Sequence, residues 1–219
     1  MSKTVLITGI QGNLGTAVAK VYQEAGFKVA GTVIPEETIR AATLQSDHTI
    51  IPVDLRNEQS AMEMIEKVTT ALGNIDEAVL TVGGFTMNPV VHTSTASIRE
   101  QLELNFLTAY NVAAPLFKQM LQQGSGRIFL IGSRPGMDMK NGKGMAAYAL
   151  SKSLLFRLAE LMNEEAEGTD VFVSVVVPST IDTPQNRAAM PDADFSQWVK
   201  AETIAARMLG SVKEAVIVF

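Results

Sequence analysis

The stretch KTVLITGIQGNLGTAVAKVYQEAG, residues 3–26, decides the fold class. It predicts a short β-branched strand, a turn with glycines at Gly9, Gly12 and Gly15, and the start of a helix. Glycine permits positive φ angles and close approach of a ligand, and the free N–H groups at a helix start attract anions. The spacing departs from G-x-G-x-x-G, so the turn alone leaves two interpretations open: a phosphate cradle, or a connection without a ligand.

Strand-like and helix-like segments alternate along the rest of the chain. Short β-branched runs, mostly apolar on both faces, predict strands at Val5–Thr8, Lys28–Val33, Thr49–Val53, Ile75–Val82, Arg127–Gly132, Val171–Val177 and Glu214–Val218. Helical spacing predicts helices at Leu14–Ala25, Glu36–Leu44, Glu58–Leu72, Ser97–Gln122, Ala146–Glu167 and Ala201–Leu209. This alternation predicts an α/β fold: one doubly wound Rossmann-fold domain over residues 1–219, with a mainly parallel seven-stranded sheet and helices on both faces.

The amino-acid composition argues against several classes of function. The chain has 219 residues, 47% of them apolar, with a net charge of −5 and no clustered cations, which argues against a nucleic-acid partner. It contains no cysteine and only two histidines, so we expect no disulfide, thiol nucleophile or metal site. No stretch matches a signal peptide or a membrane span, which favours a cytoplasmic protein that acts on small molecules without a membrane partner.

A second pattern lies far downstream in YALSK, where Tyr148 and Lys152 are four residues apart on one face of a predicted helix. A phenol has a pKa near 10, and a nearby ammonium group favours its ionised form. Lowering that pKa to about 7 requires roughly 4 kcal/mol of differential stabilisation. Together with the glycine-rich turn and with Ser133 at the end of the fifth strand, this pair indicates acid–base catalysis.

At this point the chain resembles the short-chain dehydrogenase/reductase family over nearly its full length. The matching segments are TGIQGNLG (8–15), Asp54 in VDL, Asn105 in LELNFLTAYNVAAP, Ser133 in LIGS, Tyr148 with Lys152, and VVPSTIDTP (176–184). The resemblance implies that Tyr148 exchanges a proton with the substrate oxygen and that Ser133 holds that oxygen. It implies that Lys152 lowers the Tyr148 pKa and binds the nicotinamide ribose, and that Asn105 supports a water linking Lys152 to solvent.

The same resemblance implies a nicotinamide dinucleotide cofactor, NAD(P)(H), and a carbonyl or alcohol substrate. Asp54 would accept a hydrogen bond from the adenine amino group, and Thr183 would contact a phosphate or the nicotinamide amide. We further expect the backbone N–H groups of Asn13 and Leu14 to face the phosphates. The full set of expected cofactor contacts is Gly9, Gln11, Gly12, Asn13, Leu14, Gly15, Asp54, Leu55, Gly83, Gly84, Tyr148, Lys152, Pro178, Ile181 and Thr183.

Two positions depart from the family pattern. Asn13 stands where the family usually has glycine, although asparagine tolerates left-handed backbone and can cap a helix. Val82-Gly83-Gly84 replaces N-A-G and removes an asparagine that braces the sheet. Both variants, and the stretch 179–198 with Trp198, resemble the dihydropteridine reductase branch. That branch tends to lack the serine and asparagine, so a quinonoid pterin substrate stays an alternative.

The end of the second strand bears on the choice of dinucleotide. A carboxylate there would bind the ribose 2′-OH of NAD, and a nearby cation would accept the 2′-phosphate of NADP. Thr32 and Val33 occupy this place, followed by Glu36 and Glu37, and Arg40 is the nearest cation. Because no carboxylate stands at the decisive position, the sequence weakly favours NADP(H).

Two other function classes compete with this reading. A serine hydrolase would need glycines two residues before and after Ser133, where the chain has Ile131 and Pro135. A non-catalytic dinucleotide sensor would be expected to lose Tyr148 or Lys152, and both are present. The long apolar helices predicted at 97–122 and 146–167 pair across two-fold axes in this family, so we expect a homodimer or homotetramer.

Overall fold

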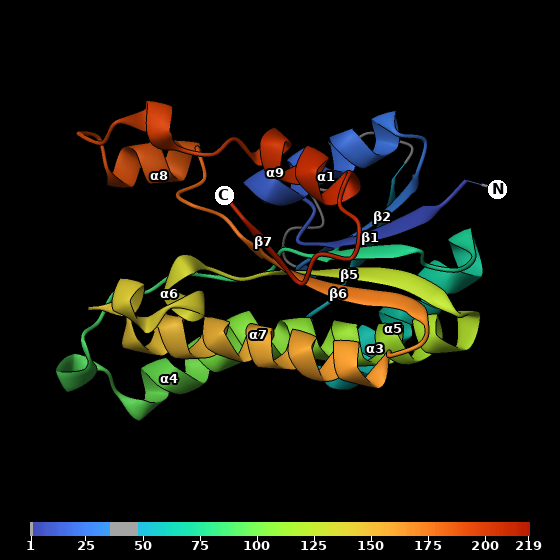
Figure 1. Cartoon of the computed structure of the whole chain (residues 1–219), viewed down its shortest axis with the longest axis horizontal. Coiled ribbons are helices and arrows are strands. Elements are labelled where there is room, and N and C mark those ends of the chain that lie inside the picture. The colour runs from blue at the N-terminus through green and yellow to red at the C-terminus, as the bar shows by residue number, and fades with distance from the viewer. Residues whose placement is uncertain (1, 36–47) are drawn as a thin grey trace.

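The computed structural model describes residues 2–35 and 48–219. Seven parallel strands form one sheet in the order β3-β2-β1-β4-β5-β6-β7 (Figure 1). The strands are β1 (Thr4–Thr8), β2 (Lys28–Val33), β3 (Thr49–Pro52), β4 (Glu77–Leu80), β5 (Ser125–Ile131), β6 (Asp170–Val177) and β7 (Val216–Val218). The order reverses direction between β1 and β4, so the predicted doubly wound sheet is confirmed, with its switch point beside the glycine-rich turn.

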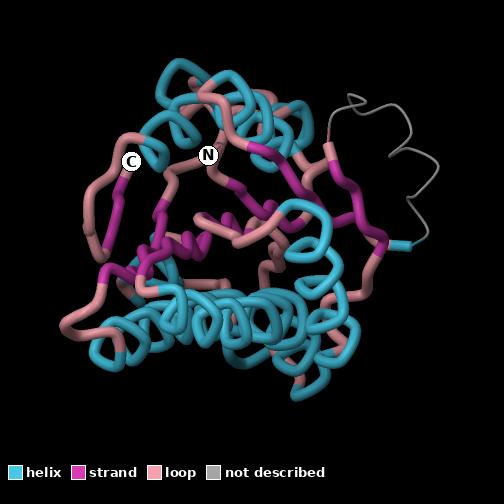
Figure 2. Tube along the Cα trace, turned by 90° about the vertical axis from the view of Figure 1, so that its right-hand side faces the viewer, coloured by secondary structure: helices cyan, strands magenta, loops and turns pink. Residues whose placement is uncertain are grey.

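Helices cover both faces of the sheet (Figures 1 and 2). Helices α1 (Asn13–Glu24) and α9 (Ala201–Leu209) pack together on one face. The other face carries α3 (Glu58–Leu72), α4 (Thr95–Leu102), α5 (Thr108–Gln123), α6 (Arg134–Met137) and α7 (Ala146–Glu165). Helix α8 (Pro184–Ala189) follows β6 and extends beyond the sheet edge.

The sheet separates two hydrophobic cores, as the apolar strands require. In β1, Val5 and Ile7 point to the core under α1 and α9, whereas Leu6 points to the core under α3, α5 and α7. All three side chains are fully buried, and burial of such a side chain contributes about 1.5–3 kcal/mol. A strand that is apolar on both faces is therefore stable only between two helical layers.

Most predicted elements agree with the structure to within two residues at each end. The main difference lies in the helix predicted at 97–122, which begins at Thr95 and is interrupted by a π-helical turn, η3 (Glu103–Leu107), between α4 and α5. The helix predicted at 36–44 lies outside the described residues. Short turns of 3-10 helix at Val90–His92, Met139–Gly142 and Phe195–Gln197 were not predicted. Among residues 2–35 and 48–219, no helix is long and apolar enough to cross a membrane.

Candidate active site

The glycine-rich turn connects β1 to α1 at the carboxyl end of the sheet. Gly9 has φ +63°, and a Cβ on Gly15 would lie 2.4 Å from the Gly9 carbonyl oxygen. No other residue than glycine fits these two positions without a shift of the backbone. Gly12 is the N-cap of α1 and offers no side chain, so the first N–H groups of the helix have no side-chain acceptor. The turn therefore presents an anion-binding helix start, as expected for a phosphate cradle.

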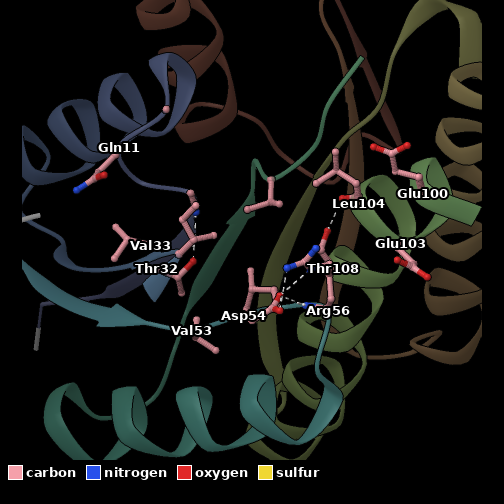
Figure 3. Close-up of a pocket in the computed structure, with 15 residues that line it drawn as sticks. Gln11, Thr32, Val33, Val53, Asp54, Arg56, Glu100, Glu103, Leu104 and Thr108 are labelled. Atoms are coloured by element: carbon pink, nitrogen blue, oxygen red, sulfur yellow. Dashed lines mark hydrogen bonds and ion pairs between the residues drawn. The ribbon is translucent and has the colours of Figure 1, made fainter. Parts of the chain in front are cut away.

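A cavity of about 360 Å³ adjoins this turn (Figure 3). Five expected cofactor residues line it, namely Gly9, Gln11, Gly12, Asp54 and Leu55, together with Thr32, Val33, Ile34, Val53, Arg56, Val82, Glu100, Glu103, Leu104 and Thr108. The side-chain Nε2 of Gln11 is buried and has no hydrogen-bond partner among the described residues. The Asp54 carboxylate is held by the Arg56 side chain at 2.9 and 3.0 Å, and this hydrogen bonding keeps the pKa of Asp54 below its usual range.

The second group of predicted residues meets next to this cavity, at the carboxyl ends of β4 and β5. Lys152, on α7, is buried, and its Nζ donates to the Ile131 carbonyl over 2.8 Å. Burial lowers the pKa of Lys152 to about 8. A Cβ on Gly83 would lie 3.0 Å from the Lys152 Nζ and 2.6 Å from the Asn105 Oδ1. The lysine and the asparagine therefore converge on Gly83, where a side chain would have to displace one of their polar ends.

Asn105 lies inside the π-helical turn, and its side-chain amide is fully engaged. Its Oδ1 accepts from the Gly84 N–H over 2.9 Å, and its Nδ2 contacts the Gly84 carbonyl, the Gln101 Oε1 and the Ser151 Oγ. Ser151 in turn donates to the Tyr148 carbonyl over 2.9 Å. These bonds join the segment after β4 to α4 and α7, so they fix the backbone that carries Tyr148 and Lys152.

Tyr148 and Ser133 lie side by side at the mouth of this group. Ser133 is the N-cap of α6, where its Oγ accepts from the Gly136 N–H over 3.1 Å. Burial raises the pKa of Tyr148, and a hydrogen bond with Ser133 offsets part of that rise. The lowered pKa that the resemblance implies for Tyr148 stays a prediction for the working enzyme. The ring of Phe85 meets the Tyr148 ring edge-on, with centroids 5.0 Å apart.

The last expected cofactor contacts lie in the segment after β6, which is not among the residues that line the cavity. Ile181 pairs with Val199 in an isolated parallel bridge, and Thr183 is buried and caps α8 by accepting from the Asn186 N–H over 3.1 Å. Pro178 precedes them at the end of β6. From the first turn, the Asn13 Nδ2 donates to the Gln185 Oε1 of α8 over 2.9 Å. The suggestion that Asn13 caps α1 is therefore wrong, because Gly12 holds that position and the Asn13 side chain points to α8 instead.

Comparison with known proteins agrees with this geometry. A family model described as short chain dehydrogenase matches residues 3–194. The chain belongs to the short-chain dehydrogenase family. Acetoacetyl-CoA reductase of Acinetobacter sp. (strain RA3849) is 30% identical over 197 residues, covering 87% of this chain and 79% of that protein. Dihydropteridine reductase of Dictyostelium discoideum is 25% identical over 211 residues, covering 95% and 87%. The solved structure of ElxO with NADP bound has a TM-score of 0.88 at 19% identity, covering 100% and 97%.

This short-chain dehydrogenase is thus an oxidoreductase of the NAD(P)-dependent dehydrogenase/reductase class. The residues present fit a dinucleotide. The turn at residues 9–15 excludes side chains where phosphates would approach, and the Gln11 amide offers a buried donor without a partner beside the cavity. Within residues 2–35 and 48–219, no cluster of three or more His, Cys, Asp or Glu side chains is placed to hold a metal ion.

Several residues of the site were not predicted from the sequence. Gln101, Ser151 and Phe85 support the catalytic group, and Arg56 holds Asp54. Ser151 lies within YALSK, so the motif contained a signal for it that was not used. The pairing of Asn13 with Gln185 joins residues 172 positions apart, and nothing in the sequence indicated it.

Proposed function

We propose that this enzyme transfers hydride between NADP(H) and a carbonyl or alcohol group of a small molecule, with Tyr148 as the residue that exchanges the proton. The observation that carries the proposal is the meeting of Ser133, Tyr148, Lys152 and Asn105 at the carboxyl ends of β4 and β5. This end of a parallel sheet is where doubly wound folds bind their ligands.

The hydrogen bonds around Ser133 suit it for holding a substrate oxygen. Its Oγ accepts from the Gly136 N–H and lies within hydrogen-bonding reach of Tyr148, so its own hydrogen stays available for a substrate oxygen. Two hydroxyl donors on one oxygen would stabilise the negative charge that develops there during carbonyl reduction. The bound dinucleotide supplies or accepts the hydride. Tyr148 then gives its phenolic proton to the substrate oxygen, or takes it back in the oxidation.

Lys152 and Asn105 would support Tyr148, the first by supplying protons and the second by holding the backbone in place. A lysine with a pKa of about 8 exchanges protons close to neutral pH, so the Lys152 ammonium suits the reprotonation of Tyr148. A positive charge brought near the phenol would favour its ionised form and so oppose the effect of burial, which raises the pKa of Tyr148. The Asn105 side chain bonds Gly84 and Ser151, so its role is to hold the π-helical turn against them.

A matched pair of tyrosine variants tests the mechanism. Absorbance of the reduced nicotinamide is followed with a panel of ketones, aldehydes and a quinonoid dihydropteridine. Tyr148→Phe is expected to lower kcat by about 10²–10⁴-fold, the usual contribution of a positioned acid. The control Tyr110→Phe, on the exposed surface of α5, is expected to leave kcat unchanged. If Tyr148→Phe turns over at the rate of the parent enzyme, the proposed mechanism is wrong. Turnover of the pterin alone would favour the dihydropteridine reductase alternative.

The preference for NADP(H) rests on the end of β2. Thr32 and Val33 bring no carboxylate to the cavity, and the Thr32 Oγ1 is already engaged by the Gly9 N–H over 3.2 Å. Nothing at this position repels a 2′-phosphate. Arg40, the nearest cation in the sequence, lies outside the described residues. Fluorescence titration is expected to give a lower Kd for NADPH than for NADH, and the reverse order would contradict the assignment.

We also infer that residues 1–219 act as one domain and associate as a homodimer or homotetramer. Helices α5 and α7, with the turn η3, expose large apolar side chains that one chain leaves uncovered, namely Leu107, Tyr110, Leu150, Leu154 and Leu161. Exposed apolar patches of this kind mark association surfaces. Light scattering coupled to size-exclusion chromatography is expected to give a mass of two or four times 23.6 kDa, and a mass of one chain would overturn the inference.

A further inference from the structure

The hydrogen bond between Asn13 and Gln185 joins the start of α1 to the segment after β6, two parts of the chain that are far apart in the sequence. Asn13 is the first residue of α1, directly after the glycine-rich turn, and Gln185 lies in the first turn of α8. The Asn13 Nδ2 donates to the Gln185 Oε1 over 2.9 Å. The family's usual glycine at position 13 has no side chain, so it could not form this bond. The departure of Asn13 from the family pattern thus has a structural counterpart in Gln185.

Among the described residues, helix α8 has few attachments to the body of the protein, so this bond contributes to holding it in place. None of its six residues is buried. Its other side-chain hydrogen bonds stay within its own segment: Thr183 accepts from the Asn186 N–H, Asn186 donates to the Ile181 carbonyl, and Arg187 pairs with Asp182. Within the parts of the chain that the structure describes, the Asn13–Gln185 bond is the one side-chain hydrogen bond between α8 and another segment.

We propose that Asn13 and Gln185 form a clasp that holds α8 across the phosphate end of the dinucleotide and slows its release. This inference rests on the proposed function, because it requires a dinucleotide seated on the turn at residues 9–15. The two ends of the clasp flank the expected cofactor contacts: Asn13 carries an N–H expected to face the phosphates, and Thr183 lies two residues before Gln185. A dinucleotide seated between them would be retained longer while this bond is closed, which is the effect that the clasp predicts.

The size of the effect follows from the exposure of both side chains. Both residues are exposed, so breaking the bond removes a hydrogen bond of ordinary net strength rather than leaving a buried polar group unpaired. Such a bond corresponds to a factor of roughly three to ten in an equilibrium or rate constant. The chemical step does not use either side chain, so the clasp acts on cofactor exchange and not on hydride transfer.

Stopped-flow fluorescence of bound NADPH tests the clasp directly, because it reports binding without turnover. Gln185→Ala is expected to raise the dissociation rate constant about three- to tenfold. Gln197→Ala is the matched control, since Gln197 is also exposed, lies in the same segment and bonds to the nearby Ser196 and Asp194 rather than to α1. Equal dissociation rates for the parent enzyme and Gln185→Ala would overturn the proposal, as would an equal rise in Gln197→Ala.

A double-mutant cycle shows whether the effect passes through Asn13. Asn13→Ala removes the donor but keeps a residue suited to the helix start. If the clasp operates, Gln185→Ala has little further effect on the dissociation rate in the Asn13→Ala background. Fully independent effects of the two substitutions would show that Gln185 acts in another way and would overturn the clasp.

A measurement on the dinucleotide-free protein separates this proposal from the proposed function. The N–H groups of Arg187 and Met190 donate within α8, and their hydrogen exchange is expected to be faster in Gln185→Ala than in Gln197→Ala. Unchanged exchange would overturn the clasp even if the enzyme turns over normally. Faster NADPH release from Gln185→Ala, together with an unchanged kcat in Tyr148→Phe, would instead support the clasp and reject the assigned mechanism. A protein that binds neither NADPH nor NADH would overturn both.

Discussion

Replacement of Lys152 by methionine separates what this residue contributes to catalysis from what it costs in stability. Lys152 is buried in α7, and its pKa is lowered from 10.5 to about 8 because burial disfavours the charged form. The shift corresponds to roughly 3 kcal/mol of destabilisation at neutral pH, at about 1.4 kcal/mol per pKa unit. Methionine has a similar length and carries no charge, so Lys152→Met removes this penalty.

The variant also loses one favourable contact. The Lys152 Nζ donates to the Ile131 carbonyl over 2.8 Å, and a buried carbonyl left without its donor costs about 1–2 kcal/mol. The net expectation at pH 7 is a stabilisation of about 1–2 kcal/mol. For a chain of this size, that raises Tm by roughly 2–8 °C. Turnover should be lost in the same variant, because the positive charge beside Tyr148 is gone.

The pH dependence gives the decisive measurement. Between pH 8 and 10.5 the unfolded chain binds a proton at Lys152 that the folded chain has lost, so the stability of the parent protein rises with pH in this window relative to the variant. The advantage of Lys152→Met should therefore shrink above pH 8 and change sign near pH 10, where only the lost hydrogen bond remains. Urea unfolding of the dinucleotide-free proteins at pH 7, 8, 9 and 10 measures this difference, with Lys67→Met on the exposed face of α3 as the control.

A variant that is less stable than the parent protein at pH 7, or a difference that does not change with pH, would refute the reasoning. The first outcome would mean that the Ile131 contact outweighs the burial of charge. The second would mean that Lys152 keeps an ordinary pKa in the folded protein.

Three further substitutions test the first turn, a helix cap and a buried acid. Gly15→Ala places a Cβ 2.4 Å from a carbonyl oxygen and should cost about 1–3 kcal/mol in thermal unfolding, whereas Gly210→Ala, with its nearest neighbour at 3.5 Å, should cost far less. Asn57→Ala removes the side-chain acceptor at the start of α3 and should lower the free energy of unfolding by about 1 kcal/mol in urea; an unchanged midpoint would count against the cap. Burial raises the pKa of Glu77, so the parent loses stability as pH rises through that pKa, and Glu77→Gln should match the parent at pH 4 and exceed it at pH 8. Equal stability at both values would contradict this.

The parts of the structure that follow from local pattern were predictable. Strands apolar on both faces require helices on both sides of a parallel sheet, and this requirement placed all seven strands to within two residues. The shared helix of Tyr148 and Lys152 followed from spacing, because residues four apart on a helix share a face, and both lie on α7. The turn at residues 9–15 followed from the special backbone freedom of glycine, which Gly9 uses with φ +63°.

Features that depend on tertiary contacts could not be read from the sequence. No residue pattern at 103–107 predicts the π-helical turn. The turn places the Asn105 side chain against the Gly84 backbone, and this contact depends on the folded structure. The bidentate hold of Arg56 on Asp54 depends on two side chains folding back on each other at a turn. In the same way, no pattern in residues 179–198 reveals that Gln185 reaches a residue at the other end of the chain.

The two departures from the family pattern, Asn13 and Val82-Gly83-Gly84, are best understood from the residues that they contact in the folded chain. A Cβ on Gly9 would lie 3.1 Å from the Val82 Cγ2, so Val82 packs against the first turn where the family's asparagine would brace the sheet. The neighbouring Gly84 is held by Asn105, which bonds both its N–H and its carbonyl. Asn13 does not cap α1, because the N-cap position is held by Gly12, which has no side chain to bond the helix N–H groups. The Asn13 side chain bonds to Gln185 instead. Each unusual residue therefore has a specific partner in the fold, so a family motif is better judged by the contacts of its members than by their identity.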